Sequence, residues 1–212
     1  MTHTVTIHNE NFILHPSGAI FWSARNSLLI ADVHLGKVSH FRKAGVAVPP
    51  TSVFGNFAQL EQVTEFFNPG RIIFLGDLFH SDLNSEWLLF REWAVGVASA
   101  VILIAGNHDV IAPYRYEEMG VPVFDELRLG RFLLTHKPEE EAGMFNFCGH
   151  IHPSVRLRGG GRQFLTMPCF FHRPVQMILP AFGQFTGTYE MIPHTDDCVY
   201  AVTRDEVIVV CG

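Results

Sequence analysis

The stretch Ala105-Gly106-Asn107-His108-Asp109 follows the apolar run Val101-Ile102-Leu103-Ile104, so a predicted buried strand ends abruptly in polar residues. Asn107 can offer an amide oxygen to a metal ion, and His108 can transfer a proton. Gly106 lets the backbone bend closely around a bound group. A plain turn is the alternative, because Gly, Asn and Asp are common turn formers. The rest of the chain favours a site.

Two apolar strands, predicted at 27–31 and 72–75, precede this one and alternate with amphipathic helices. The first helix follows the potential caps Thr51 and Ser52, and the second begins near Asn84. Their inward positions recur at helical spacing: Phe54, Phe57, Leu60, Val63 and Phe67, then Trp87, Phe90, Trp93 and Val97. This order predicts parallel strands with right-handed crossovers. Hairpins before residue 23 and short strands after residue 126 make the expected fold mixed α/β (α+β).

Five predicted strands end in side chains that can bind metal ions. In chain order these are Asp32 and His34, Asp77, Asn107 and His108, His136, and His150 and His152. Ligand sites of α/β sheets lie beyond the carboxyl ends of the strands, so the five ends can converge. A single Asp-x-His or His-x-His pair is common on surfaces, whereas the ordered set is far more specific. Its mixture of imidazole, carboxylate and amide suits Mn²⁺, Fe or Zn²⁺ better than Mg²⁺ or Ca²⁺.

Length and composition limit the possible classes of protein. A chain of 212 residues is expected to form one domain, 1–212, that folds without a structural metal. The net charge of −6 argues against a broad surface that coats nucleic acid, although a local basic patch remains possible. The four cysteines are expected to be reduced thiols: Cys148, Cys169, Cys198 and Cys211. Without a signal peptide or membrane span in the sequence, we expect a soluble, cytoplasmic protein.

The chain resembles the calcineurin-like metallophosphoesterase superfamily in five motifs: Asp32-x-His34, Gly76-Asp77, Gly106-Asn107-His108-Asp109, His136 and Gly149-His150-x-His152. A narrower resemblance, to the ligase-associated, PdeM-type branch, rests on residues 31–37, 76–82, 149–153 and 179–187. It extends from about Gly18 to Tyr189. The resemblance implies a four-layer αββα sandwich, in which helices flank two sheets and two metal ions lie at one edge.

The resemblance also implies a ligand set: Asp32, His34 and His152 for the first ion, Asn107, His136 and His150 for the second, and Asp77 for both. Mn²⁺ is the favoured ion, with Fe or Zn²⁺ as alternatives. Two such ions can activate a bridging water, whose hydroxide attacks phosphorus. His108 is the candidate that stabilises or protonates the leaving oxygen. Asp109 or Asp82 could orient His108, and the sequence leaves this open.

Other polar residues near the motifs allow both a functional and a structural interpretation. His80 could reach the site or be solvated, and His172 is more consistent with a packed or surface position. Basic residues that could line a substrate entrance or simply face water are Lys37, His40, Arg42 and Lys43, and also Arg156, Arg158 and Arg162. Residues 158–162 read as a hairpin turn rather than a phosphate loop, because no GK[ST] follows.

Three functions are compatible with these residues. The leading hypothesis is a phosphodiesterase or endonuclease acting on DNA in repair, because the resemblance implies association with a DNA ligase. The alternative is a hydrolase of small phosphomonoesters or nucleotides. A catalytically inactive metal-binding scaffold is the third, and the intact ligand set speaks against it. A metallo-β-lactamase-type hydrolase is disfavoured because the chain contains no HxHxDH stretch. The sequence indicates no membrane partner and leaves the oligomeric state open.

Overall fold

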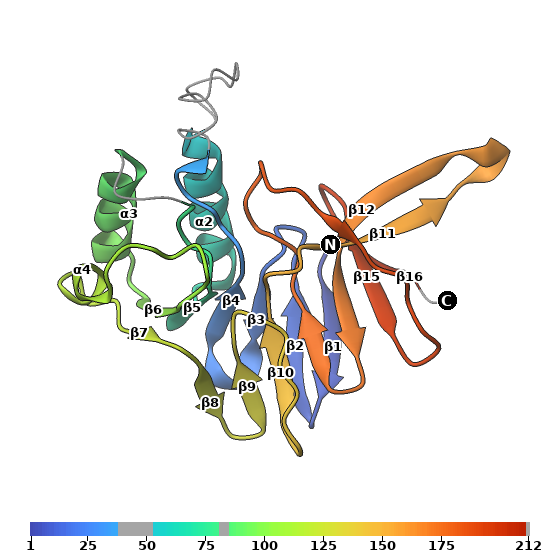
Figure 1. Ribbon diagram of the computed structural model, residues 1–212, viewed down its shortest axis with the longest axis horizontal. Helices are drawn as coiled ribbons and strands as arrows, with labels where there is room; N and C mark the ends of the chain where they lie inside the picture. Colours follow the sequence, from blue (N-terminus) through green and yellow to red (C-terminus); the bar gives the residue numbers. More distant parts are fainter. Residues whose placement is uncertain (38–52, 81–84, 211–212) are drawn as a thin grey trace.

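Two β-sheets pack against each other, and α-helices cover the other face of the first sheet (Figure 1). The computed structural model describes residues 1–37, 53–80 and 85–210. In each sheet, the parallel strands end on the same side, and the motifs of the sequence follow these strand ends. In the described part of the chain, no helix is long and apolar enough to cross a membrane.

The first sheet contains seven strands in the described residues, in the order β1 to β7. Its strands are β1 (His3–Ile7), β2 (Glu10–Leu14), β3 (Ile20–Trp22), β4 (Ser27–Ile30), β5 (Arg71–Leu75), β6 (Ala100–Ile104) and β7 (Val123–Phe124). Pairing is antiparallel from β1 to β4 and parallel from β4 to β7. The α-helices in this part of the chain are α2 (Val53–Phe67), α3 (Ser85–Gly96) and α4 (Pro113–Glu117), and the 3-10 turn η1 (Ser23–Arg25) precedes β4.

The second sheet contains nine strands in the described residues. They are β8 (Leu127–Leu129), β9 (Phe132–Leu134), β10 (Phe145–Cys148), β11 (Pro153–Arg158), β12 (Phe164–Arg173), β13 (Gln176–Ile178), β14 (Tyr189–Glu190), β15 (Cys198–Val202) and β16 (Val207–Val210). The 3-10 turn η3 (Gly160–Arg162) joins β11 to β12. Strands β9, β10 and β13 run parallel, so β9 and β10 end at the same edge.

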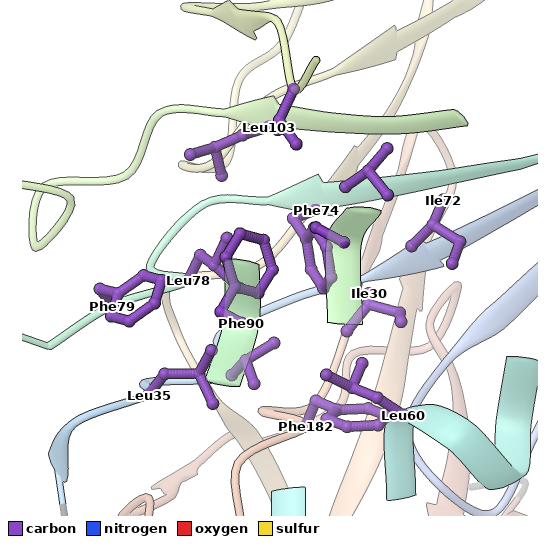
Figure 2. Packing of buried hydrophobic residues seen from close by; sticks show 14 of the residues in the cluster. Ile30, Leu35, Leu60, Ile72, Phe74, Leu78, Phe79, Phe90, Leu103 and Phe182 are labelled. Atoms are coloured by element: carbon purple, nitrogen blue, oxygen red, sulfur yellow. The ribbon is translucent and has the colours of Figure 1, made fainter. Parts of the chain in front are cut away.

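Alternation along the central strands divides the core into two layers. Leu28 and Ile30 of β4 point towards the helices, whereas Leu29 points towards the second sheet. Figure 2 shows the helix-side layer, in which Ile30 and Phe74 of the strands lie near Leu60 of α2 and Phe90 of α3. Burial on both faces explains why these strands are continuously apolar.

Aromatic rings fill the layer between the sheets. Phe12 of β2 and Phe147 of β10 are fully buried, with ring centroids 4.7 Å apart, and Phe132 packs against both. Phe147→Ala is expected to lower the free energy of unfolding by about 3–5 kcal/mol, because the cavity lies where two sheets meet. Urea denaturation measures this. The matched control is Phe54→Ala, which removes a ring that is 57% exposed and is expected to change stability by less than about 0.5 kcal/mol.

The structure confirms the mixed α/β sandwich and the parallel pairing of the three central strands. The inward position predicted for Phe54 is wrong, because this residue lies in the first turn of α2, beyond the edge of the packed face. Strand β12 is longer than predicted, and α4, β7 and β14 were not predicted. The predicted turn at 158–162 is confirmed. Cys148, Cys169 and Cys198 are free thiols, whereas Thr51, Ser52, Asn84 and Cys211 lie outside the described residues.

Candidate metal centre

The first group of metal-binding side chains joins the ends of β4 and β10. Asp32, His34 and His152 each offer a ligand atom, and these atoms all lie within 4.8 Å of one another. The Nε2 atom of His152 lies 3.3 Å from Oδ1 of Asp32 and 3.3 Å from Nε2 of His34. These three residues are the ones that the family resemblance implies for the first ion.

The second group joins the ends of β5, β6, β9 and β10. Asp77, His136 and His150 again offer ligand atoms within 4.8 Å of one another. The Oδ1 atom of Asn107 lies 3.0 Å from Nε2 of His136, so the amide joins the same group. Oδ1 of Asp77 lies 3.4 Å from His136 Nε2, and its Oδ2 lies 3.9 Å from His34 Nε2. Asp77 therefore contacts both groups, and the ligand assignment itself stays a prediction.

Five of the seven predicted ligands adopt left-handed backbone conformations. Their φ angles lie between 50° and 68°, at Asp32, His34, Asp77, His150 and His152. Such conformations are unfavourable for most L-residues and concentrate at functional sites, where surrounding contacts hold them. Here the loops after β4 and β5 hold each other through hydrogen bonds. The amide of Asp32 donates to the carbonyl of Gly76, and the amide of His34 donates to the carbonyl of Asp77.

Three glycines allow the ligand loops to approach one another. A Cβ at Gly76 would collide with the ring of His136, and one at Gly106 would collide with Asp77. At Gly149 it would collide with the carboxylate of Asp32. Gly76 also has a φ of 82°. These positions need glycine because the ligand side chains occupy the space beside the backbone.

Gly106→Ala is expected to displace Asp77 and weaken Mn²⁺ affinity by about 10- to 100-fold, the usual cost of disturbing the support of a metal ligand. The measurement is a Mn²⁺ titration monitored by calorimetry. Gly160→Ala is the matched control, because the added methyl group at this position meets no atom within 4 Å beyond the adjacent residues of the chain. Equal Mn²⁺ affinity of the two variants would contradict the role given to Gly106.

The donor set fits divalent cations. Asp32 is fully buried, and its Oδ1 atom has no hydrogen-bond partner among the described residues. Buried carboxylates in proteins are usually paired with a positive charge or coordinate a metal ion. Burial, together with repulsion from His152, lowers the pKa of His34 to about 2, and burial also lowers the pKa of His150. The neutral imidazole is the form that binds metal ions.

His108 lies at the solvent side of the two groups. Its side chain is 45% exposed, and its Nε2 atom lies 4.0 Å from Oδ2 of Asp77. Its backbone amide donates a 2.9 Å hydrogen bond to Oδ1 of Asp77, which fixes the loop that carries the ring. The ring lies 5.7 Å from that of His34 between centroids. His108 can therefore exchange a proton with a molecule that enters from solvent.

Asp109 ties two ligand loops together. Its Oδ2 accepts a 2.8 Å hydrogen bond from the amide of Gly106, and its Oδ1 accepts a 3.0 Å bond from the amide of Phe79. Burial raises the pKa of Asp109, against the lowering effect of these two hydrogen bonds. Its contacts thus position the loops after β5 and β6. An orienting effect on His108 stays a prediction, and Asp82 lies outside the described residues.

The structure distinguishes the remaining histidines. The ring of His80 lies 5.2 Å from that of His108 and 5.6 Å from that of His34, so it borders the site. His172 instead packs between Phe145 and Tyr200, as predicted.

Lys37 is partly buried near the ligand groups. Burial lowers its pKa, and the carboxylates of Asp32 and Asp77 partly offset this effect. The electrostatic effect of these two carboxylates shows that Lys37 lies near the ligand groups, and its contact with an anionic substrate stays a prediction. Its predicted companions lie outside the described residues: His40, Arg42 and Lys43.

Two supporting residues were not predicted. Glu86 of α3 is buried, and its carboxylate accepts a 2.7 Å hydrogen bond from the amide of Gly36, just after the first ligand pair. Asn56 of α2 donates to the carbonyl of Val33 and accepts from the amide of Gln184. The sequence signal that could have indicated them is a polar residue directly before a predicted buried position, as Glu86 stands before Trp87 and Asn56 before Phe57. Both helices therefore hold the loop that carries Asp32 and His34.

Comparison with known proteins adds a family and a close structural likeness. The family model described as calcineurin-like phosphoesterase matches residues 26–180. The crystal structure of Pseudomonas putida nuclease MPE is similar over 99% of this chain and 100% of that chain, with a TM-score of 0.82 and 27% sequence identity. The phosphoesterase Yfce from E. coli aligns over 87% of this chain and 98% of that chain, with a TM-score of 0.46 and 16% identity. A search of curated proteins found no match.

Proposed function

Because the chain belongs to the calcineurin-like phosphoesterase family, we propose that it is a metal-dependent phosphodiesterase that cleaves DNA. The observation that carries the proposal is the convergence of two His/Asp groups, with Asp77 between them and His108 at their solvent side. The likeness to a nuclease over the full length of both chains supports DNA as the substrate. As the resemblance to the ligase-associated branch implies, we place the activity in cytoplasmic DNA repair, beside a DNA ligase.

The same residues give the proposed metal sites. Asp32, His34 and His152 would hold one ion, and the group around His136 would hold the other, with Asp77 shared. Manganese is the proposed metal, with iron or zinc as alternatives, because a mixture of imidazole nitrogen with carboxylate and amide oxygen suits these three ions better than magnesium or calcium. When bound, two such ions supply the charge that activates water and polarises the phosphoryl group.

The protein's own part in the reaction is to hold the ligands and manage the leaving group. His108 donates a proton from its ring to the departing oxygen, which would otherwise leave as an alkoxide. The hydrogen bonds of Asp109 to Gly106 and Phe79 keep the loop of His108 in place. A cavity of about 270 Å³ adjoins Asn107 and His136, with Lys137 and the acidic residues Asp125 and Glu139 in its wall.

The deciding experiment compares Mn²⁺-dependent hydrolysis of bis(p-nitrophenyl) phosphate with that of p-nitrophenyl phosphate. Asp77→Ala, prepared in the same way, is the control for contaminating enzymes. Diester cleavage that disappears in this variant supports a phosphodiesterase and leads to assays on defined DNA. Cleavage of the monoester alone would identify a small-molecule phosphatase instead. If neither compound nor DNA is cleaved, the inactive-scaffold hypothesis replaces the proposal.

A further inference from the structure

Strands β11 and β12 form a two-stranded ribbon that projects beyond the sandwich (Figure 1). Most side chains from Arg156 to Pro168 are exposed, and none is buried. The exposed residues include Phe164 at 54% and Leu165 at 59%. A ribbon exposed to this degree gains little from burial, which points to a role in contacting another molecule.

The pairing register gives the ribbon two chemically different faces. Arg156 pairs with Thr166, and Arg158 pairs with Phe164, so these four side chains share one face. The guanidinium of Arg156 lies 4.3 Å from the centre of the Phe164 ring. The alternate residues Val155, Leu157 and Met167 occupy the other face, where they join the small apolar cluster on the second sheet. The first face is therefore cationic and aromatic, whereas the second is apolar and packs on the protein except at the exposed Leu165.

Strands β11 and β12 and the turn between them carry only positive charge, although the whole chain carries −6. From Ala142 to Tyr189 the sequence contains no aspartate or glutamate, and the next acidic residue, Glu190, pairs with Ser154 at the base of the ribbon. Among the described residues, the ion pairs of the structure include none formed by Arg156, Arg158 or Arg162. Arginines without acidic partners, next to an exposed ring, are the groups that contact phosphates and bases of nucleic acids.

The ribbon starts at the candidate metal centre, because β11 begins directly after His152. At about 3.3 Å per residue, Arg156 and Arg158 lie roughly 13 and 20 Å along the strand from His152. At about 3.4 Å per nucleotide, these distances correspond to roughly four to six nucleotides. We propose that the cationic face of the ribbon binds the phosphodiester chain of a nucleic acid several nucleotides away from the bond that is cleaved. This inference rests on the proposed function and adds to it a docking surface outside the reacting centre.

The test measures binding of a fluorescent 20-nucleotide DNA by anisotropy, in EDTA so that the strand stays intact. The double variant Arg156→Ala/Arg158→Ala is expected to bind about five- to tenfold more weakly at 100 mM salt. The plot of log affinity against log salt should become shallower by roughly 1.4 to 1.8, the amount expected from two lost phosphate contacts. Arg204→Ala is the matched control, because Arg204 is an exposed arginine in the turn between β15 and β16. It should bind as the wild type does.

A second measurement varies the length of the DNA with the wild-type protein. Affinity should rise steeply between two and eight nucleotides, because only the longer strand reaches Arg156 and Arg158. If the double variant binds the 20-nucleotide DNA with wild-type affinity and salt dependence, the docking surface is wrong. Wild-type cleavage of DNA would in that case still support the proposed function. If the wild type neither cleaves nor binds DNA, both proposals fail.

Discussion

Asp77→Ala is expected to lose both bound metal and all measurable diester hydrolysis. The carboxylate contacts His136 of one ligand group and His34 of the other, and it also accepts the amide of His108. Its removal leaves each group short of a negative ligand and frees the loop that carries His108. Metal content measured by mass spectrometry and hydrolysis of bis(p-nitrophenyl) phosphate should fall together.

A further variant shows whether the charge of Asp77 or only its shape matters, and a second variant serves as its control. Asp77→Asn keeps an oxygen that can accept the amide of His108, and asparagine tolerates the left-handed backbone at this position. It should therefore fold normally and still bind metal poorly. Asp196→Ala, which removes an exposed carboxylate far along the chain, should resemble the wild type. Full metal content and turnover in Asp77→Asn would refute the bridging role.

His108→Ala is expected to retain metal near the wild-type level while its turnover of DNA falls by about 10²- to 10⁴-fold, the range typical of a lost general acid. The ring is half exposed and lies beyond the ligand groups, so its removal leaves their contacts intact. Steady-state kinetics on DNA and metal analysis of the same preparation provide the two readouts.

The leaving group separates proton donation from a structural effect. Nitrophenolate departs readily without a proton, whereas the oxygen released from DNA does not. The loss in His108→Ala should therefore be much smaller with bis(p-nitrophenyl) phosphate than with DNA. His194→Ala removes an exposed histidine elsewhere and should affect neither substrate. An equal loss on both substrates would mean that His108 positions the site rather than donates a proton.

Much of the fold could be predicted from the sequence, because the signals are local. Strands such as β5 and β6 are apolar and end in polar motifs, and α2 and α3 have buried residues at helical spacing. The elements that escaped prediction are short or depend on distant partners. Strand β14 contains two exposed residues that become a strand only by pairing with β11, and α4 spans a single turn.

For the candidate site, too, some features could be predicted from the sequence and others could not. Sequence alone indicated which side chains would meet, since the ends of parallel strands share an edge. It could not indicate that Asp109 would use both oxygens on backbone amides, because these contacts depend on the path of two loops. Nor could it show that Gly106 and Gly149 make room for Asp77 and Asp32, which lie far away in sequence.

The first ligand group combines residues that are far apart in the sequence, and this separation determines when the group can form during translation. His34 and His152, whose rings are in contact, are 118 positions apart. A ribosome that has released only the first sheet has therefore produced Asp32 and His34 without their partner. The hydrogen bond from His152 to the carbonyl of Gly187 requires still more of the chain. The nascent protein thus acquires its complete centre late in translation, when the second sheet has emerged.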